Sequence, residues 1–245
     1  MIILFSTSNS PTFNLAAEDF LFSERQDDLL FLYVNEPSVI IGCNQAIRNE
    51  VDFEFCTKNE IQVVRRMSGG GAVFHDLGNL NFCFISNKID GKSVLNDDFL
   101  NPIVEVLRTL GVSAEIGKRK DLWLPDGYKI SGTASHVSKN RELHHGTLLY
   151  SADLEKLQNA LTTNSVDKQT KAIASVPSPV KNISSFLVQR SLTAPSPADF
   201  FKLFLKRMKD LYDVNDVTQL TTNEMLEIEK LQESKYELAA WTFKK

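Results

Sequence analysis

Residues 65–76 read RRMSGGGAVFHD, and the rest of the chain is organised around this stretch. The apolar run 61–64 precedes it, so we expect a strand that delivers two arginines to three consecutive glycines. Glycine lets a ligand approach backbone N–H groups closely, and guanidinium groups bind phosphate or carboxylate in a bidentate manner. The stretch therefore predicts an anion-binding loop, with a glycine-rich hairpin turn as the alternative.

Two familiar nucleotide-binding motifs are excluded. A dinucleotide-binding fingerprint that begins at Gly69 and Gly71 requires glycine where Phe74 stands. A Walker A motif ending at residues 91–93 requires glycine where Ser86 stands. A phosphate-binding loop in this chain must therefore belong to a different fold.

Composition indicates an ordinary soluble protein. Of 245 residues, 42% are hydrophobic and 24% are charged, which suits one large α/β domain. The formal net charge of -4 argues against a general nucleic-acid or anionic-membrane binder, because such proteins need a basic surface. The run at 1–6 is too short for a signal segment or a membrane span, and it is expected to be the first strand.

Cysteine and histidine spacing gives no metal motif. Cys43, Cys56 and Cys83 are far apart and form no CxxC pair, so we expect reduced thiols in a cytoplasmic compartment. Among the four histidines there is no HxH or HExxH spacing. His144 and His145 are adjacent in an expected strand and should point to opposite faces, so they should not share one metal ion.

Hydrophobic periodicity and turn residues predict a chain that alternates strands and helices. Thr12 or Asn14 is expected to cap the first helix, Ser151 a short helix after the last strand, and Ser196 a long helix. Residues 162–185 are polar and are expected to form a long loop, either functional or a solvated connection. The expected strands are 1–6, 29–34, 39–42, 61–64, 80–85, 112–116, 121–124, 128–135 and 142–150; the expected helices are 12–24, 51–59, 99–110, 154–161, 197–211 and 225–231.

A second candidate site is the stretch KISGTA at residues 129–134. In a strand, Lys129, Ser131 and Thr133 would share one face, so Lys129 would project among small residues that leave room for a ligand. An exposed lysine on an edge strand is the alternative reading.

Three motifs together resemble the lipoate-protein ligase A family. They are RRMSGGGAVFHDLGN at 65–79, KISGTA at 129–134 and HHGTLL at 144–149, and the resemblance covers roughly residues 4–187. The segment 175–182 is also similar to the eukaryotic lipoyltransferase branch, because Pro177 and Pro179 stand where bacterial ligases typically carry arginines.

The resemblance implies an α/β (α+β) fold of the biotin/lipoyl protein ligase type, with mixed, mostly antiparallel sheets flanked by helices. It implies one catalytic domain over residues 1–245, without the C-terminal accessory domain of two-domain ligases. Residues 241–243 are similar to the start of the segment that leads into that domain. The implied reaction uses ATP and Mg²⁺ to convert lipoate to lipoyl-AMP. The lipoyl group then passes to a lysine of an apo lipoyl domain, in E2 subunits of 2-oxoacid dehydrogenases or in the glycine cleavage H protein.

The resemblance also assigns residues to this chemistry. Lys129 is the implied catalytic residue, which would offset charge on the lipoyl carbonyl and the phosphate. Asp121 would help hold Mg²⁺ with the nucleotide. The implied ATP and lipoyl-AMP site comprises Arg66, Ser68, Gly71, Ala72, Val73, Phe74, Asn79, Asp121 and Lys129. The implied lipoate pocket comprises Gly70, His75, Gly132, Ala134 and His145; for His75, His144 and His145 a structural strand histidine is the alternative.

Several functions stay open at this point. The chain could be a transferase that uses preformed lipoyl-AMP, or one half of a split ligase that needs a separate accessory protein. Octanoyl transfer fits less well because no cysteine has a catalytic context, and a biotin ligase lacks its GRGRxGR-type loop here. A binding module that holds lipoyl-AMP without turnover is the alternative outside enzymes. No nucleic acid and no membrane is expected as a partner.

Overall fold

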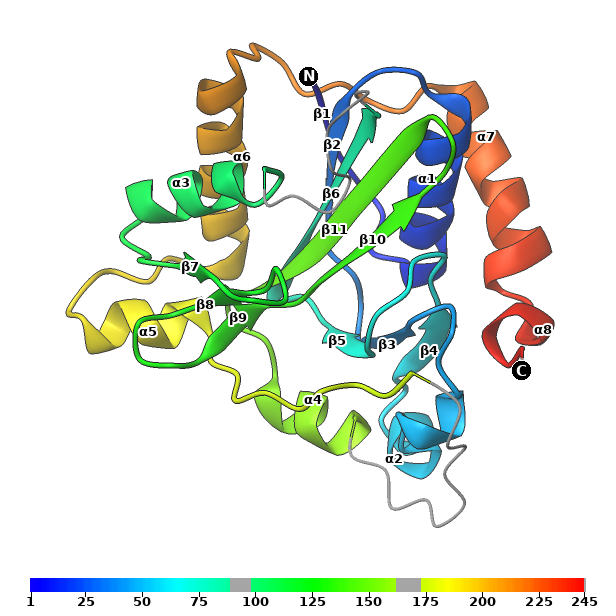
Figure 1. The fold of residues 1–245 in the computed structure, drawn as a ribbon, viewed down its shortest axis with the longest axis horizontal. Coiled ribbons are helices and arrows are strands. Elements are labelled where there is room, and N and C mark those ends of the chain that lie inside the picture. The colour runs from blue at the N-terminus through cyan, green and yellow to red at the C-terminus, as the bar shows by residue number, and fades with distance from the viewer. Residues whose placement is uncertain (89–97, 162–172, 245) are drawn as a thin grey trace.

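The computed structural model describes residues 1–88, 98–161 and 173–244. A five-stranded sheet runs diagonally through the centre of the molecule (Figure 1). Only β1 and β2 pair in parallel in this sheet; the other neighbours are antiparallel. The strand order is β1 (Ile2–Phe5), β2 (Leu29–Tyr33), β6 (Asn79–Asn87), β11 (Arg141–Leu149) and β10 (Thr133–Val137).

Two three-stranded sheets complete the strand structure of the described residues. The first has the order β4 (Gln62–Arg65), β3 (Ser38–Ile41), β5 (Val73–His75), with β3 parallel to β4 and antiparallel to β5. The second is antiparallel, with the order β7 (Glu115–Ile116), β8 (Leu122–Trp123), β9 (Lys129–Ser131). The expected mixed and mostly antiparallel arrangement is confirmed.

Helices cover both faces of the central sheet (Figure 1). On one face lie α3 and α6, and on the other lie α1 and α7. The helices are α1 (Pro11–Glu24), α2 (Phe53–Lys58), α3 (Asn101–Thr109), α4 (Leu154–Ala160), α5 (Ile183–Gln189), α6 (Pro197–Tyr212), α7 (Thr222–Leu231) and α8 (Ala239–Thr242), with a 3₁₀ turn at Ile47–Asn49 and a π turn at Gln232–Tyr236.

Strand β2 shows why this sheet must be covered on both faces. All five of its residues are buried. Leu30 and Leu32 join the cluster beneath α3 and α6, whereas Leu29 and Phe31 join the cluster beneath α1. Successive strand residues point to opposite faces, so a continuous apolar run needs an apolar layer on each side.

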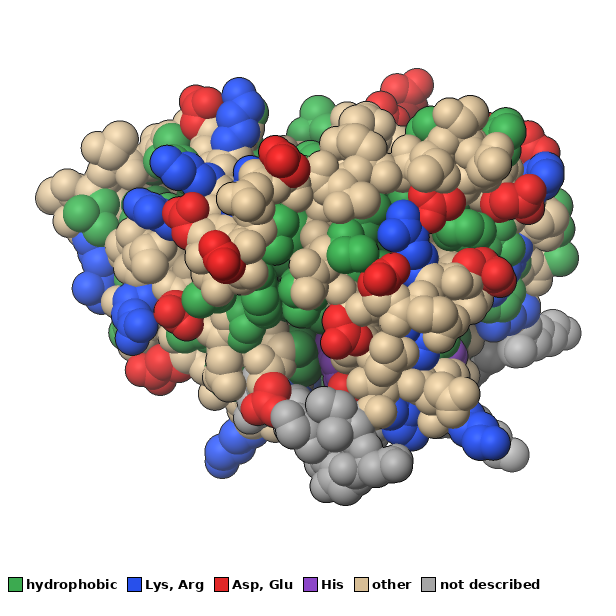
Figure 2. Space-filling model, turned by 90° about the horizontal axis from the view of Figure 1, so that it is seen from above, with side chains coloured by type: hydrophobic (Ala, Val, Ile, Leu, Met, Phe, Trp, Pro, Cys, Tyr) green, Lys and Arg blue, Asp and Glu red, His purple; other side chains and the backbone are tan. Residues whose placement is uncertain are grey.

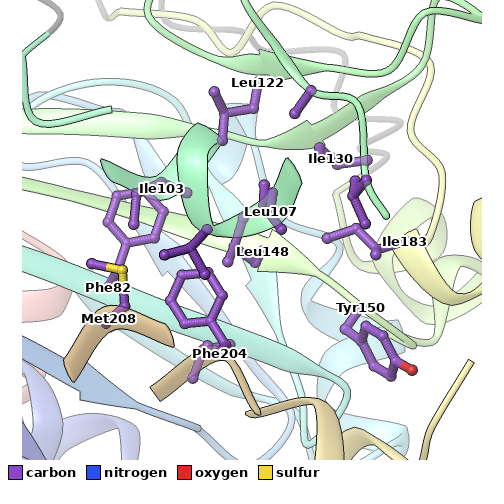
Figure 3. Packing of buried hydrophobic residues seen from close by; sticks show 14 of the residues in the cluster. Phe82, Ile103, Leu107, Leu122, Ile130, Leu148, Tyr150, Ile183, Phe204 and Met208 are labelled. Atoms are coloured by element: carbon purple, nitrogen blue, oxygen red, sulfur yellow. The ribbon is translucent and has the colours of Figure 1, made fainter. Parts of the chain in front are cut away.

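The larger of these clusters fixes α3 and α6 on the sheet. Figure 3 shows Ile103 and Leu107 of α3 packed near Phe204 and Met208 of α6. Phe82 of β6 belongs to the same cluster. These five side chains are fully buried. Burial of each such side chain stabilises the fold by roughly 1.5–3 kcal/mol.

The structure corrects several local predictions. The first helix is capped by Ser10, whose side chain accepts from the N–H of Phe13, so neither Thr12 nor Asn14 is the cap. The cap of α4 is Asp153, and the prediction of Ser151 was wrong because the helix begins two residues later. Ser196 caps α6 as expected, with Pro197 as its first residue. The expected loop 162–185 ends earlier than predicted, because helix α5 begins at Ile183. The loop residues 162–172 lie outside the described part of the chain.

The expected strand over 128–135 is two strands, because the chain changes sheet at Gly132. Two hydrogen bonds to Thr147 hold this break: Gly132 N–H donates to the side-chain Oγ1 of Thr147 at 3.2 Å, and Thr147 N–H donates to Gly132 O at 3.1 Å.

Acidic and basic side chains are interspersed over the described part of the face drawn in Figure 2, in line with the low net charge. No helix of the described residues has the length and apolar character needed to span a bilayer.

Candidate active site

A pocket of about 310 Å³ lies where the three sheets meet. Its walls come from β5, β6, β9, β10 and β11, and the segment 173–176 forms one side. The pocket brings together segments that are far apart in the sequence, and most of the predicted site residues line it. Those lining residues are Arg66, Gly70, Gly71, Ala72, Val73, His75, Asp121, Lys129, Gly132, Ala134 and His145.

Three predicted residues do not line the pocket. Ser68 is fully buried behind it and contacts lining residues by hydrogen bonds. The Phe74 side chain lies in the core beside α2, since β5 alternation sends Val73 and His75 the other way. Asn79 is buried and donates to Asn81 Oδ1 at 2.8 Å, and it is Asn81 that lines the pocket.

The glycine-rich loop is folded back tightly on the end of β3. Gly70 has φ of +86°, a conformation that residues with a Cβ adopt only at a cost. Gly42 follows β3, and a Cβ there would lie 2.1 Å from Gly70 O. Glycine at both positions therefore permits a contact between two backbones.

Arg66 holds the loop from inside. Its guanidinium donates to Ser68 Oγ at 2.9 Å, and to the carbonyl oxygens of Ile40, Gly69 and Gly71 at 3.0, 2.5 and 2.8 Å. Burial lowers the pKa of Arg66 to about 10, so the group stays cationic at neutral pH. Arg66 thus shapes the loop and places a positive charge at the pocket wall.

Arg65 does not reach the pocket, which corrects the expectation that both guanidiniums flank an anion. Its side chain is fully buried on the other side of β4. It donates to the carbonyl oxygens of Gly42, Gln45 and Thr242 at 2.8, 2.9 and 2.9 Å. Arg65 therefore connects the loop after β3 to the C-terminal helix α8.

Lys129 enters the pocket from β9 and pairs with Asp121, at 3.3 Å between Nζ and Oδ2. The Lys129 side chain is 20% exposed, so it is not the exposed edge-strand lysine of the alternative reading. Burial lowers the pKa of Lys129, and Asp121 offsets this only in part. Burial alone would raise the pKa of Asp121, but a hydrogen bond from Trp123 and the Lys129 ammonium lower it overall. The two groups form an ion pair.

The side chains that line the pocket could supply one carboxylate ligand to Mg²⁺. Among the described lining residues, Asp121 is the only carboxylate, and Lys129 and Arg119 lie 3.3 and 3.7 Å from its Oδ2. Mg²⁺ commonly binds one or two carboxylates together with substrate phosphates. The residues present fit an ion that is carried mainly by phosphate oxygens, with Asp121 as one protein ligand.

His145 is held between two buried partners. Its Nε2 lies 2.7 Å from Ser68 Oγ, and its Nδ1 lies 2.8 Å from Glu18 Oε2. Glu18 also accepts from Tyr33 at 2.9 Å. Its neighbour His144 points away from this network and stacks on Phe99 at 4.4 Å, as strand alternation predicts.

The segment 173–176 contributes a residue that the sequence did not single out. Ser175 Oγ accepts from Ala72 N–H at 2.8 Å, and its own N–H faces both carboxylate oxygens of Glu50 at 3.2 Å. The backbone donor expected for phosphate is therefore held by a neutral hydroxyl in this structure. No local pattern signals this contact, because the two residues are 103 positions apart.

The pocket combines an apolar wall with fixed cations. Leu15, Ile40 and Val73 line it together with Arg66 and Lys129. An α/β domain with such a pocket suits a ligand that has an apolar part and an anionic group.

The family model for the lipoyl protein ligase A/B catalytic domain matches residues 10–209. Lipoate–protein ligase 1 of Staphylococcus aureus is 40% identical over 238 residues, which cover 95% of this chain and 70% of that protein. The chain therefore belongs to the lipoyl protein ligase A/B catalytic domain family, as the resemblance indicated.

Solved structures agree with this membership. A bi-partite lipoate protein ligase of Thermoplasma acidophilum, studied with its E2 lipoyl domain, is similar with a TM-score of 0.81 and 27% identity, covering 99% of this chain and 95% of that chain. A lipoate-protein ligase A bound with ATP has a TM-score of 0.81 and 26% identity, covering 99% and 98%. The predicted fold is thereby confirmed.

Proposed function

We propose that residues 1–245 form the catalytic domain of a lipoate–protein ligase. In the first half-reaction a lipoate carboxylate oxygen attacks the α-phosphorus of ATP, and pyrophosphate leaves. In the second, the amine of an acceptor lysine attacks the acyl carbon of lipoyl-AMP; AMP leaves and the amine loses a proton. Family membership and the ATP-bound relative support both substrates.

The observation that carries the proposal is the position of Lys129. Its ammonium lies in the same pocket as the glycine-rich loop, next to the apolar wall that suits an acyl chain. A fixed cation there would stabilise negative charge on the acyl oxygen and the phosphate in both half-reactions, without forming a bond itself. Bound Mg²⁺ would neutralise phosphate charge, and Asp121 would serve as its protein ligand.

The proposed acceptors are apo lipoyl domains, in E2 subunits or in the glycine cleavage H protein. The Thermoplasma relative, a ligase studied with its E2 lipoyl domain, supports this class of acceptor. The three cysteines are unpaired, which supports the reducing environment of the cytoplasm as the site of action.

A second candidate is a transferase, or half of a split ligase, that needs a separate accessory protein to activate lipoate. The similarity to a bi-partite ligase supports this second candidate. In both cases the described pocket would bind lipoyl-AMP and perform the transfer.

One experiment separates these functions. An apo lipoyl domain is incubated with the protein and either lipoate plus Mg-ATP or synthetic lipoyl-AMP, and its mass is measured. We expect acylation from both donors. Acylation from lipoyl-AMP alone would show the transferase or split ligase, and acylation from neither would leave only a binding role.

A further inference from the structure

A chain of buried amides ends at His75 in the pocket. Ser6 Oγ donates to Asn14 Oδ1 at 2.6 Å, and Asn14 Nδ2 donates to Asn35 Oδ1 at 2.8 Å. Asn35 Nδ2 lies 3.0 Å from His75 Nδ1. Both asparagines are 0% exposed and His75 is 3% exposed, so water does not compete for these bonds.

The direction of every bond in this chain is fixed by its first amide. Asn14 Nδ2 also lies 2.9 Å from the carbonyl oxygen of Ser8, which can only accept a hydrogen bond. The Asn14 amide therefore cannot be flipped. It follows that Asn35 presents its oxygen to Asn14 and its NH₂ group to His75.

This direction sets the tautomer of His75. Because Asn35 donates to Nδ1, that nitrogen must keep its lone pair, and the ring proton of a neutral imidazole is on Nε2. Burial, together with the charges of Arg66 and His145, lowers the pKa of His75 to about 3, so the ring is neutral at physiological pH.

The remaining nitrogen, Nε2, belongs to a residue of the pocket wall. His75 and Val73 line the pocket from β5, on the face opposite Phe74. Within residues 1–88, 98–161 and 173–244, His75 Nε2 has no hydrogen-bond partner, yet it is not among the buried atoms that are sealed from solvent. His75 is therefore a buried residue of the pocket wall whose Nε2–H is available to a ligand.

We propose that Asn14 and Asn35 act as positioning residues that fix His75 as an Nε2–H donor to an oxygen of the bound acyl nucleotide. This inference rests on the function proposed above and adds a contact to it. The acceptor is an anionic oxygen of that ligand, because the cations Arg66 and Lys129 line the same pocket and favour an anion there. His75 is then unable to act as a base, since its lone pair is used by Asn35.

The tautomer is tested by ¹⁵N NMR of histidine-labelled protein. In the wild-type protein we expect His75 to carry its proton on Nε2 alone from pH 5 to pH 8. In Asn35→Asp the neighbouring group can only accept, so Nδ1 should become protonated. Asn9→Asp is the matched control: it makes the same charge change at an exposed residue whose amide donates to Val34 O, so the His75 signals should not change. A wild-type ring protonated on Nδ1, or one that titrates near pH 6.5, would overturn the assignment.

The contact with the ligand is tested by calorimetry with a sulfamoyl analogue of lipoyl-AMP. His75→Phe keeps a ring but has no donor, and we expect binding roughly 10- to 100-fold weaker, as for loss of a hydrogen bond to a charged group. His75→Gln restores an N–H near the position of Nε2 and should regain part of the affinity. Equal binding by the wild-type protein and by a folded His75→Phe variant would overturn the contact. If the folded wild-type protein does not bind the analogue at all, the proposed function itself fails.

Discussion

At the level of single residues, the ion pair of Lys129 and Asp121 governs the charge of the pocket. We expect Lys129→Ala to reduce lipoyl transfer from lipoyl-AMP by roughly 10²- to 10³-fold, the usual effect of losing a fixed donor to a developing oxyanion. The fold should persist, because the Asp121 carboxylate still has an ion-pair partner in Arg119, whose Nη2 lies 3.7 Å from Oδ2. Single-turnover transfer, followed by mass spectrometry, measures the effect.

Lys181→Ala is the control for that variant. Its ammonium pairs with Asp126 at 2.6 Å and does not line the pocket, so transfer should stay near the wild-type rate. Transfer by Lys129→Ala at the rate of this control would exclude the proposed electrostatic role.

Asp121→Asn is predicted to shift the pH dependence of transfer. Asp121 raises the pKa of Lys129 against the opposing effect of burial, so its neutralisation should lower that pKa further. The protonated lysine is then lost at lower pH, and the falling, high-pH limb of the rate profile should move to lower pH. A pH–rate profile of the variant beside Asp126→Asn measures this; an unmoved limb would show that Lys129 does not work as a cation.

Asp121 also makes the stability of the fold depend on pH, in the acidic range. Its pKa in the folded state lies below its ordinary value, so the folded carboxylate binds its proton less readily than the unfolded one. This contribution is present above the unfolded pKa, about 3.9, and is lost as pH falls through the folded pKa.

At the level of structural elements, the glycine-rich loop allows a paired test. Gly70 has φ of +86° and a Cβ there would lie 3.0 Å from Arg66 Nη2, whereas a Cβ on Gly69 would meet no atom within 4 Å. We expect Gly70→Ala to lower the free energy of unfolding by about 1–2 kcal/mol, and Gly69→Ala to change it by less than about 0.5 kcal/mol. Urea unfolding measures both. Equal values would mean that the Gly70 conformation does not constrain the loop.

The sequence predicted most elements because their hydrophobic patterns are strong. The run 29–34 and the helical stripe from Phe99 to Leu110 became a fully buried strand and a helix with one buried face, both close to their expected limits. Helix caps were predicted less well, since Ser10, Thr12 and Asn14 are all suitable residue types and only the tertiary position of the helix selects one. The break at Gly132 depends on Thr147 of another strand, which no local pattern reveals.

The candidate site was predicted in its motifs but not in its supporting contacts. Lys129 and the loop residues 70–73 line one pocket, as their joint resemblance to the family implied. The amide chain through Asn14 and Asn35 was missed, because each residue is separated by tens of positions from the group it orients. Arg65 and Arg66 also differ in role only because the end of β4 sends them to opposite sides.

For the whole molecule, we expect Arg65→Met to be destabilising by about 3 kcal/mol, because it leaves several buried carbonyl groups without their donor. The segment 239–244 should also exchange its amide hydrogens faster. Urea unfolding and hydrogen exchange measure these effects. In the control, Arg207→Met, the arginine is 45% exposed and pairs with Asp210 at 3.5 Å, so little change is expected. Unchanged exchange at 239–244 in Arg65→Met would contradict the anchoring role.

The contact between Arg65 and Thr242 spans 177 positions of the chain. During synthesis on a ribosome, the loop at 65–76 is made early, while the carbonyl that Arg65 holds at residue 242 arrives much later. A nascent chain can pair its central strands before that moment, but the arginine beneath the loop lacks part of its coordination. The full set of hydrogen bonds to the Arg65 guanidinium can therefore form only after residues 242–244 have been synthesised.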